Sequence, residues 1–596
     1  MKLVNNLGAS LRGMKKEKTF NHFDASIGKL NPLVELKSVV AILTTFIIAS
    51  CGTAKITTNN NAKEITFVTV TNSMVAKQTE MTEEEIQSWP HADIFTDSIP
   101  GMSLAKAYDF VVNKKSKMVI VGVIDSGMDI EHEDLKDVIW TNKNEIANNG
   151  KDDDDNGYVD DINGWNFLGG EKGQSNPEQL EITRTVKKWM PRFDGKTADS
   201  IDEKEMADFN LFVKLKKVID KKNADATKQA TQYTFIRDFV STTNDTIQKL
   251  LGKKEYSLTE VDNATLTNPS LMQGKMIIMR ILDAGDTVDA ALDQLNEIVN
   301  YYSSQVNSHY KISFNGRLTG DDPYNITDTN YGNGNVIGSK DTENHGTHVS
   351  GIIAAKRNNG IGMNGVANNV QIMALRVVPD GDEYDKDVAL AIRYAADNGA
   401  KVINMSFGKG RSPNAEWVYD AIKYAESKDV LLVHAAGNDG GNFDVDDNFP
   451  NDSKDKLIEF ADNVLTVGAI TPYFDDRLVA SFSNYGKNNV DIFAPGTEIY
   501  ATYPKNNYKF EQGTSMAAPE VAGVAALIRS YYPNLTASQV KHIIMDSGLE
   551  YPNNVMKPAQ DGVLPENINF NDLSVSGRIL NAYNALLMAD SITNKN

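Results

Sequence analysis

The sequence predicts an α/β fold: a doubly wound parallel sheet flanked by helices, with a large and mostly helical insertion. Three observations lead to this prediction. Short apolar runs rich in β-branched residues are typical of buried parallel strands, and the first is Met118–Ile124. Such runs alternate with helical patterns through the C-terminal half of the chain. Between residues 171 and 315 the strand-like runs vanish, and charged and apolar residues alternate at helical spacing.

The expected elements follow one another along the chain. A first helix is expected over Gly101–Val112, where Ala, Leu and Tyr recur at helical spacing. Strands are then expected at Met118–Ile124, Val370–Val378, Val402–Met405, Val430–Val433, Val464–Ile470 and Val490–Ala494. Helices are expected at Lys386–Asp397, Ala415–Ser427, Ala537–Ser547 and Gly577–Met588.

Composition excludes some classes of partner. The chain has 596 residues and a formal charge of −20, from 60 basic and 80 acidic side chains. Nucleic acids and anionic membranes attract basic surfaces, so we expect no nucleic-acid partner. The chain has one cysteine, which rules out a disulfide within it.

The N-terminal end has the pattern of an export signal. The apolar run Val39–Ala49 is too short to span a bilayer but suits the core of a signal peptide. The ending Ile48–Cys51 resembles the lipobox of bacterial lipoproteins, which implies lipidation of Cys51. We therefore expect an exported lipoprotein of the cell envelope, at the outer membrane or cell surface and held by a lipid anchor. The alternative is a signal anchor or an ordinary export signal.

Three polar motifs stand where elements begin or end. Asp125 ends the first strand, and functional groups gather at the carboxyl ends of strands in open α/β sheets, although a lone aspartate more often caps a turn. His345 opens a helical run, and the pair formed with His348 also suggests a metal site, but no third ligand is near. Ser515 lies in GTSMAAPEVAG, Gly513–Gly523, at a predicted helix N-terminus, which favours developing negative charge. A nucleophilic serine needs a general base beside it, such as a histidine, and a third group that orients this base, such as an aspartate.

The three motifs together, VIDSG, HGTHVSG and GTSMAAP, resemble the subtilisin-like serine peptidases, or subtilases. The resemblance covers roughly residues 99–589 apart from the insertion. It implies a triad in which Ser515 is the nucleophile, His345 the general base and Asp125 the group that holds the imidazole. In the stretch HAAGNDG it implies that the side-chain amide of Asn438 binds the oxyanion, a contribution of about 3–4 kcal/mol.

The resemblance also implies a substrate-binding region. The segment Ser406, Phe407 and Gly408 would lie along the substrate, and the specificity pocket would be walled by this segment and by Ala435, Ala436 and Gly437. Their small side chains predict an open pocket that tolerates apolar residues. One position departs from the family, because Glu520 stands where a histidine usually follows the proline.

An acidic loop, KDDDDNGYVDDINGWN, follows the first strand at residues 151–166. Its first half matches an EF-hand-type calcium loop, but Asn163 occupies the place of the bidentate glutamate. The expected Ca²⁺ ligands are Asp152, Asp154, Asn156, the Tyr158 carbonyl, and Asp160 or Asp161 as the replacement. The alternative is a solvated acidic loop without an ion.

The predicted organisation is a signal segment (1–50), an N-terminal tether (51–98), a peptidase domain (99–170 and 316–590) and the helical insertion (171–315). A structureless loop of that length is improbable, so we expect the insertion to fold and to cap or flank the cleft. It would be a lid, a partner-binding surface or a restraint on substrate size.

We therefore expect a secreted or envelope-anchored serine endopeptidase acting on polypeptides, with activity that rises as His345 becomes neutral. The alternatives are a processing protease of narrow specificity and a catalytically silent binding protein whose cleft is capped by the insertion. An esterase is disfavoured, because Ser515 lacks the Gly-x-Ser-x-Gly context.

Overall fold

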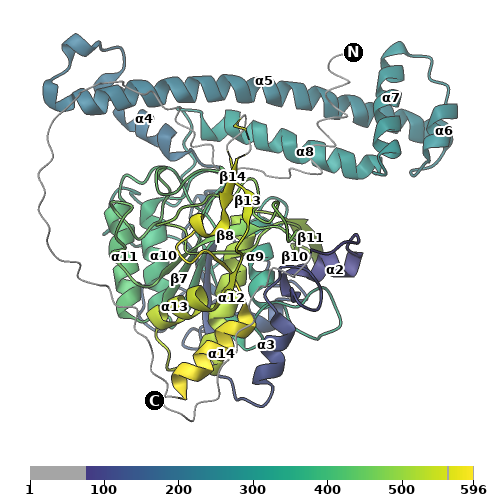
Figure 1. Ribbon diagram of the computed structural model, residues 1–596. Coiled ribbons are helices and arrows are strands. Elements are labelled where there is room, and N and C mark those ends of the chain that lie inside the picture. Colours follow the sequence, from purple (N-terminus) through teal and green to yellow (C-terminus); the bar gives the residue numbers. More distant parts are fainter. Residues whose placement is uncertain (1–75, 560–562, 565, 595–596) are drawn as a thin grey trace, which may run out of the picture.

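The computed structural model describes residues 76–559, 563–564 and 566–594, and its centre is a nine-stranded sheet (Figure 1). The strand order is β12-β15-β9-β8-β7-β6-β1-β5-β2, and every pairing is parallel except that of β12 with β15. The strands are β1 (Val119–Asp125), β2 (Gly164–Asn166), β5 (Val370–Arg376), β6 (Val402–Met405), β7 (Leu431–Ala435), β8 (Val464–Ile470), β9 (Ile492–Pro495), β12 (Leu549–Glu550) and β15 (Arg578–Ile579). The predicted doubly wound α/β class is confirmed.

Helices cover both faces of the sheet. The central helix α12 (Thr514–Tyr531) packs on several strands of one face, together with α9 (His345–Ala354), α3 (Leu104–Val111), α13 (Ala537–Ser547) and α14 (Ala582–Thr593). The other face carries α10 (Asp385–Asp397) and α11 (Ala415–Ser427). The strands between these two layers are almost wholly buried, as expected for a parallel sheet.

Three two-stranded antiparallel hairpins lie outside the main sheet in the part of the chain that the structure describes. They are β10–β11 (Ile499–Tyr503 and Asn507–Glu511), β13–β14 (Asn554–Met556 and Asn567–Asn569) and β3–β4 (Gly169–Gly170 and Gly173–Gln174). The β10–β11 hairpin leads directly into α12 and so lies next to its N-terminus.

Five helices make up the insertion and lie as a separate layer across one end of the sheet domain (Figure 1). They are α4 (Glu181–Phe193), α5 (Met206–Leu251), α6 (Leu258–Asn263), α7 (Pro269–Asp283) and α8 (Val288–Ser304). The layer has an apolar core of its own, formed where α5, α7 and α8 pack together. This agrees with the predicted large helical region.

Two segments differ from the sequence expectations. The last helix begins at Ala582 and not at Gly577, because Gly577 has φ +58° and Asn581 caps the helix by accepting a hydrogen bond from the Asn584 amide. Within the predicted tether, α2 (Glu83–Ser88) and a following turn are folded against the domain, and the Trp89 indole donates to the Thr497 carbonyl oxygen. An indole buries a large apolar area once its N–H has a partner.

In the part of the chain that the structure describes, no helix has the length and apolar character required to cross a bilayer. The proposed signal segment and Cys51 lie outside the described residues.

Candidate active site

Asp125 and His345 meet at the carboxyl edge of the sheet, although 220 positions separate them in sequence. Asp125 is the last residue of β1 and is 2% exposed, while His345 is the first residue of α9. His345 Nδ1 lies 2.9 Å and 3.0 Å from the two carboxylate oxygens of Asp125. Gly346 permits this approach, because a Cβ there would lie 2.2 Å from the Gly127 carbonyl oxygen. The arrangement orients the imidazole and favours its cationic form.

The charge environment of His345 shifts its titration upward. Burial lowers the pKa of His345, but the Asp125 charge, its hydrogen bond and the Glu511 charge outweigh that effect and raise the pKa above its usual value. The side chain is still 33% exposed, so the imidazole is not sealed inside the protein.

Ser515 stands in the first turn of α12, where the free amides of the helix N-terminus favour negative charge. Its hydroxyl donates to the Ser406 carbonyl oxygen at 3.1 Å, and the Ser406 hydroxyl donates to the Ser515 carbonyl oxygen at 2.8 Å. In this resting conformation the Ser515 proton points at Ser406. Rotation about χ1 is needed to bring it to the imidazole, a common feature of ligand-free catalytic sites.

Asn438 follows β7 and is held by the residue next to the nucleophile. Its Oδ1 accepts hydrogen bonds from the Thr514 amide at 2.8 Å and from the Thr514 hydroxyl at 3.0 Å. A Cβ built on Gly513 would lie 3.4 Å from Asn438 Nδ2 and 3.6 Å from the Ser515 amide nitrogen, so the amide donor of Asn438 lies near the backbone of the nucleophile. Asn484 supports the same loop by accepting from the Asp439 and Gly441 amides and donating to the Ala436 carbonyl oxygen.

The six predicted substrate-binding residues end two neighbouring strands. Ser406, Phe407 and Gly408 follow β6, and Ala435, Ala436 and Gly437 end or follow β7. The two segments are joined by the buried His434, whose Nε2 lies 2.8 Å from the Phe407 carbonyl oxygen. The Gly437 amide donates to the Thr514 hydroxyl at 3.0 Å, so this segment also contacts the nucleophile helix.

The remaining buried titratable groups near the nucleophile are uncharged. Burial lowers the pKa of both His348 and His434 to about 4, so each is neutral at pH 7 and structural. Glu520 is 2% exposed, and its Oε2 has no hydrogen-bond partner among the described residues. Burial alone raises the pKa of Glu520 well above its usual value, so this carboxyl is held in its neutral form.

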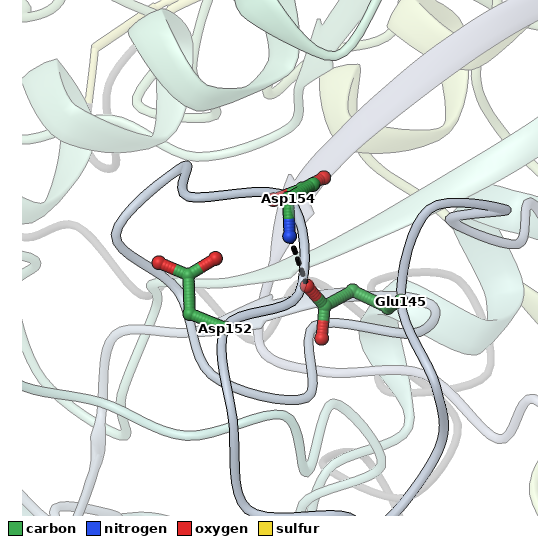
Figure 2. A group of neighbouring side chains, drawn as sticks. All are labelled: Glu145, Asp152 and Asp154. Atoms are coloured by element: carbon green, nitrogen blue, oxygen red, sulfur yellow. Dashed lines mark hydrogen bonds between the residues drawn. The ribbon is translucent and has the colours of Figure 1, made fainter.

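The acidic loop brings together three carboxylates, those of Glu145, Asp152 and Asp154 (Figure 2). One oxygen from each lies within 4.8 Å of the others. Glu145 is 8% exposed, and while its Oε1 accepts from the Asp153 and Asp154 amides, its Oε2 has no partner among the described residues. A buried orphan carboxylate oxygen in a group of three is the donor set that Ca²⁺ prefers. The group therefore fits a calcium ion.

The other predicted metal ligands lie outside this carboxylate group. Asp161 is fully buried and accepts hydrogen bonds from Asn142, Asn156 and Tyr394. Asp160 accepts from the amides of Asn149 and Gly150. Asn156 Oδ1 accepts from the Tyr158 amide. Glu145, which the sequence did not suggest, joins Asp152 and Asp154 in the carboxylate group, and the calcium ligand set stays a prediction.

Sequence reasoning missed Thr514, Glu145 and Glu511. Thr514 lies within the nucleophile motif, so its place next to Ser515 was a usable signal. Glu145 precedes the acidic loop by several residues and Glu511 is on a hairpin strand, and only the fold brings them to their sites.

Comparison with known proteins agrees with this geometry. A family model described as the subtilase family matches residues 116–567. Thermophilic serine proteinase of Bacillus sp. (strain AK1) is 44% identical over 191 residues, which are 32% of this chain and 43% of that protein. Subtilisin DY of Bacillus licheniformis is 39% identical over 206 residues, 34% of this chain and 69% of that protein. Thermitase of Thermoactinomyces vulgaris is 43% identical over 187 residues, 31% of this chain and 61% of that protein. The chain thus spans less than half of the first of these relatives.

Proposed function

The chain belongs to the subtilase family, and we propose that it is a serine endopeptidase that hydrolyses polypeptides through Asp125, His345 and Ser515. The observation that carries this proposal is the contact between the Asp125 carboxylate and His345 Nδ1, beside a serine at a helix N-terminus. A fixed imidazole next to such a serine is the arrangement that activates a hydroxyl for acyl transfer.

In the proposed reaction, the Ser515 hydroxyl turns from the Ser406 carbonyl oxygen to the free nitrogen of His345 and attacks the scissile carbonyl carbon. His345 takes the hydroxyl proton and then gives it to the leaving amine, which breaks the peptide bond and leaves an acyl ester on Ser515. Water then attacks the carbonyl carbon of the ester with His345 again as the base, the bond to Ser515 Oγ breaks to release the carboxylic acid product, and His345 returns the proton to Ser515. Asp125 accepts from Nδ1–H throughout, which fixes the tautomer and stabilises the imidazolium.

The negative oxygen of each tetrahedral intermediate would be bound by Asn438 Nδ2 and the Ser515 backbone amide. Both donors are fixed before the reaction, since Thr514 holds the amide oxygen of Asn438 and α12 holds the backbone. Fixed donors need no reorganisation when the charge develops, which is the basis of their catalytic effect.

The test is hydrolysis of an unstructured protein such as casein by the purified protein and its Ser515→Ala variant. Cleavage by the wild type alone, with new internal N-termini, supports an endopeptidase. Absence of cleavage by a folded wild type overturns broad proteolysis, and cleavage of one partner only would support the narrow processing protease. The contact between Asp125 and His345 disfavours the other alternative, a silent binding protein with a capped cleft, because a binding protein has no need of an oriented imidazole.

A calcium ion held by Glu145, Asp152 and Asp154 is part of the proposal. When bound, the ion would neutralise three clustered carboxylates and hold the loop, with no part in bond cleavage. The loop connects to the sheet domain through Asp161, which accepts from Tyr394 of α10. Loss of the ion is therefore expected to lower stability before it lowers the intrinsic rate.

Export and lipidation of Cys51 are the final part of the proposal, and they rest on the signal-like sequence alone. The protein would then reach polypeptides outside the cytoplasm from a membrane-bound position. The test is incorporation of radiolabelled palmitate in producing cells, which Cys51→Ala should abolish. Equal labelling of the variant would contradict a lipid anchor at this residue.

A further inference from the structure

Helix α8 of the insertion has two faces with different neighbours. One face buries Ala291 and Leu295 in the apolar core that α8 shares with α5 and α7. The opposite face carries Glu297, Tyr301 and Ser304, at spacings of four and three residues, so the three side chains project from one side of the helix. Each of these three residues interacts with the peptidase domain.

The two ends of this face contact two different parts of the peptidase domain, β11 and the loop after β5. Glu297 Oε1 lies 3.9 Å from Lys509 Nζ, on β11. The Ser304 hydroxyl donates to Asp380 at 2.5 Å, in the loop after β5. His309, just beyond the helix, also contacts Asp380, with 3.1 Å between Nε2 and Oδ1. The helix thus contacts the peptidase domain at both ends of this face.

Tyr301 occupies the middle of the face, between Glu297 and Ser304. Burial raises the pKa of Tyr301 to about 12. The charges of Asp380 and of Asp439, which directly follows the oxyanion residue Asn438, also raise it. Tyr301 is therefore within electrostatic range of the loop after β5 and of the oxyanion loop.

The regions that α8 contacts adjoin the elements of the catalytic site. The Lys509 carbonyl oxygen lies 3.1 Å from Nε2 of His348, one turn beyond the catalytic histidine on α9. Asp380 follows β5, the strand that pairs with β1 and its catalytic aspartate. A helix held at these two places lies beside the elements that carry His345 and Asp125, and Figure 1 shows the insertion helices as a layer across one end of the sheet domain.

The base of the insertion is fixed by buried charges. Arg317, where the chain leaves the insertion, donates to both oxygens of Asp387 on α10, at 2.7 Å and 2.9 Å. Arg184 of α4 pairs with Glu181 and donates to the Asp382 carbonyl oxygen at 2.7 Å. Breaking a buried pair of this kind is strongly destabilising, because it leaves one charge buried without its partner. The position of α8 is therefore set by the fold.

We propose that α8 is a fixed roof over the substrate cleft that excludes folded segments, and that Tyr301, between the two end contacts of this face, is its main specificity-determining residue. Glu297 and Ser304 are seven positions apart, which is about 10 Å along the helix axis. A flexible chain can enter beneath a fixed helix, whereas a folded segment is bulkier, since even a single helix with its side chains is about 10–12 Å wide. This inference rests on the proposed endopeptidase function.

The experiment compares one cleavage sequence in two settings: as a short flexible peptide and within a surface loop of a folded carrier protein. The quantity measured is the ratio of kcat/KM for the carrier to kcat/KM for the peptide. Removing the roof side chains in Glu297→Ala/Tyr301→Ala should raise this ratio roughly threefold to tenfold, since specificity is a ratio of transition-state binding. Tyr301→Trp should lower it.

Tyr256→Ala is the matched control. Tyr256 is another tyrosine of the insertion, but it packs on the core shared by α5, α7 and α8, and its hydroxyl donates to Asn244 of α5. This variant should leave the ratio unchanged, while thermal melting confirms that each variant is folded. A ratio that is unchanged in the double variant, or equally raised by Tyr256→Ala, would overturn the roof. Failure of the wild type to cleave the peptide would instead overturn the proposed function, so the two failures are distinguishable.

Discussion

Thr514 offers a sharp test of how the oxyanion donor is held. Its hydroxyl lies 3.0 Å from Oδ1 of Asn438 and its backbone amide lies 2.8 Å from the same atom. Thr514→Val keeps the shape and the backbone bond but removes the hydroxyl. One hydrogen bond contributes about 1 kcal/mol net, so we expect kcat to fall roughly fivefold with little change in KM. Thr514→Ser should restore the rate.

The expected loss of kcat is larger when the oxyanion donor itself is removed. Asn438→Ala removes the whole amide and should lower kcat by a factor of roughly 10²–10³, corresponding to about 3–4 kcal/mol. If Thr514 acts only through Asn438, adding Thr514→Val to Asn438→Ala should cost nothing further. This is a double-mutant cycle between residues in contact, and its coupling energy should equal the full Thr514 effect, about 1 kcal/mol.

The assay is steady-state hydrolysis of one chromogenic peptide by the four proteins of the cycle, with melting temperatures as a folding control. The Thr514 hydroxyl also accepts from the Gly437 amide at 3.0 Å, which provides a competing route for its effect. An equal loss of kcat from Thr514→Val in both backgrounds would refute the reasoning, because the effect would then act through Gly437 and not through Asn438.

Three further predictions concern charge. Activity should rise with pH, with an apparent pKa above the usual histidine value. The Glu511 charge helps to raise the pKa of His345, so Glu511→Gln should shift the rise in activity to lower pH. An unchanged pH–activity profile in this variant would contradict a role for the Glu511 charge. EDTA should lower the melting temperature of the wild type, and Glu145→Gln should remove most of this sensitivity, whereas Asp160→Asn should keep it; an EDTA-insensitive wild type would exclude a stabilising ion. The pKa of Glu520 is higher in the folded protein than in the unfolded chain, so the folded state binds this proton more tightly. The resulting contribution to folding stability is fully present below the pKa of the unfolded carboxyl group and is lost as the pH rises through the pKa of the folded one. Glu520→Gln should therefore gain melting temperature relative to wild type between pH 5 and pH 8, and a constant difference would count against a neutral buried carboxyl.

The sheet and the residues at its edge could be predicted because local sequence determines them. Buried parallel strands need continuous apolar runs, and Val402–Met405 and Val464–Ile470 occur where expected. The motifs around Asp125, His345 and Ser515 lie at the ends of such elements, so topology alone brings the carboxylate and the imidazole together.

Long-range contacts explain what could not be predicted. The carboxylate that joins Asp152 and Asp154 is that of Glu145, which precedes the loop and reaches it only after folding. The start of the last helix depends on the cap at Asn581, and the short strand before it forms only by pairing with β9 and β12. The placement of α8 across the cleft depends on contacts between side chains far apart in sequence, such as Ser304 and Asp380.

The most direct test of the central claim is labelling of the full-length protein with a fluorophosphonate, followed by peptide mapping. The account predicts one adduct, on Ser515, that forms more slowly in His345→Ala and is absent in Ser515→Ala. The reagent is small enough to pass beneath α8, so the roof should not prevent it. A folded wild type that remains unlabelled, or an adduct on another serine, would contradict a triad formed by Asp125, His345 and Ser515.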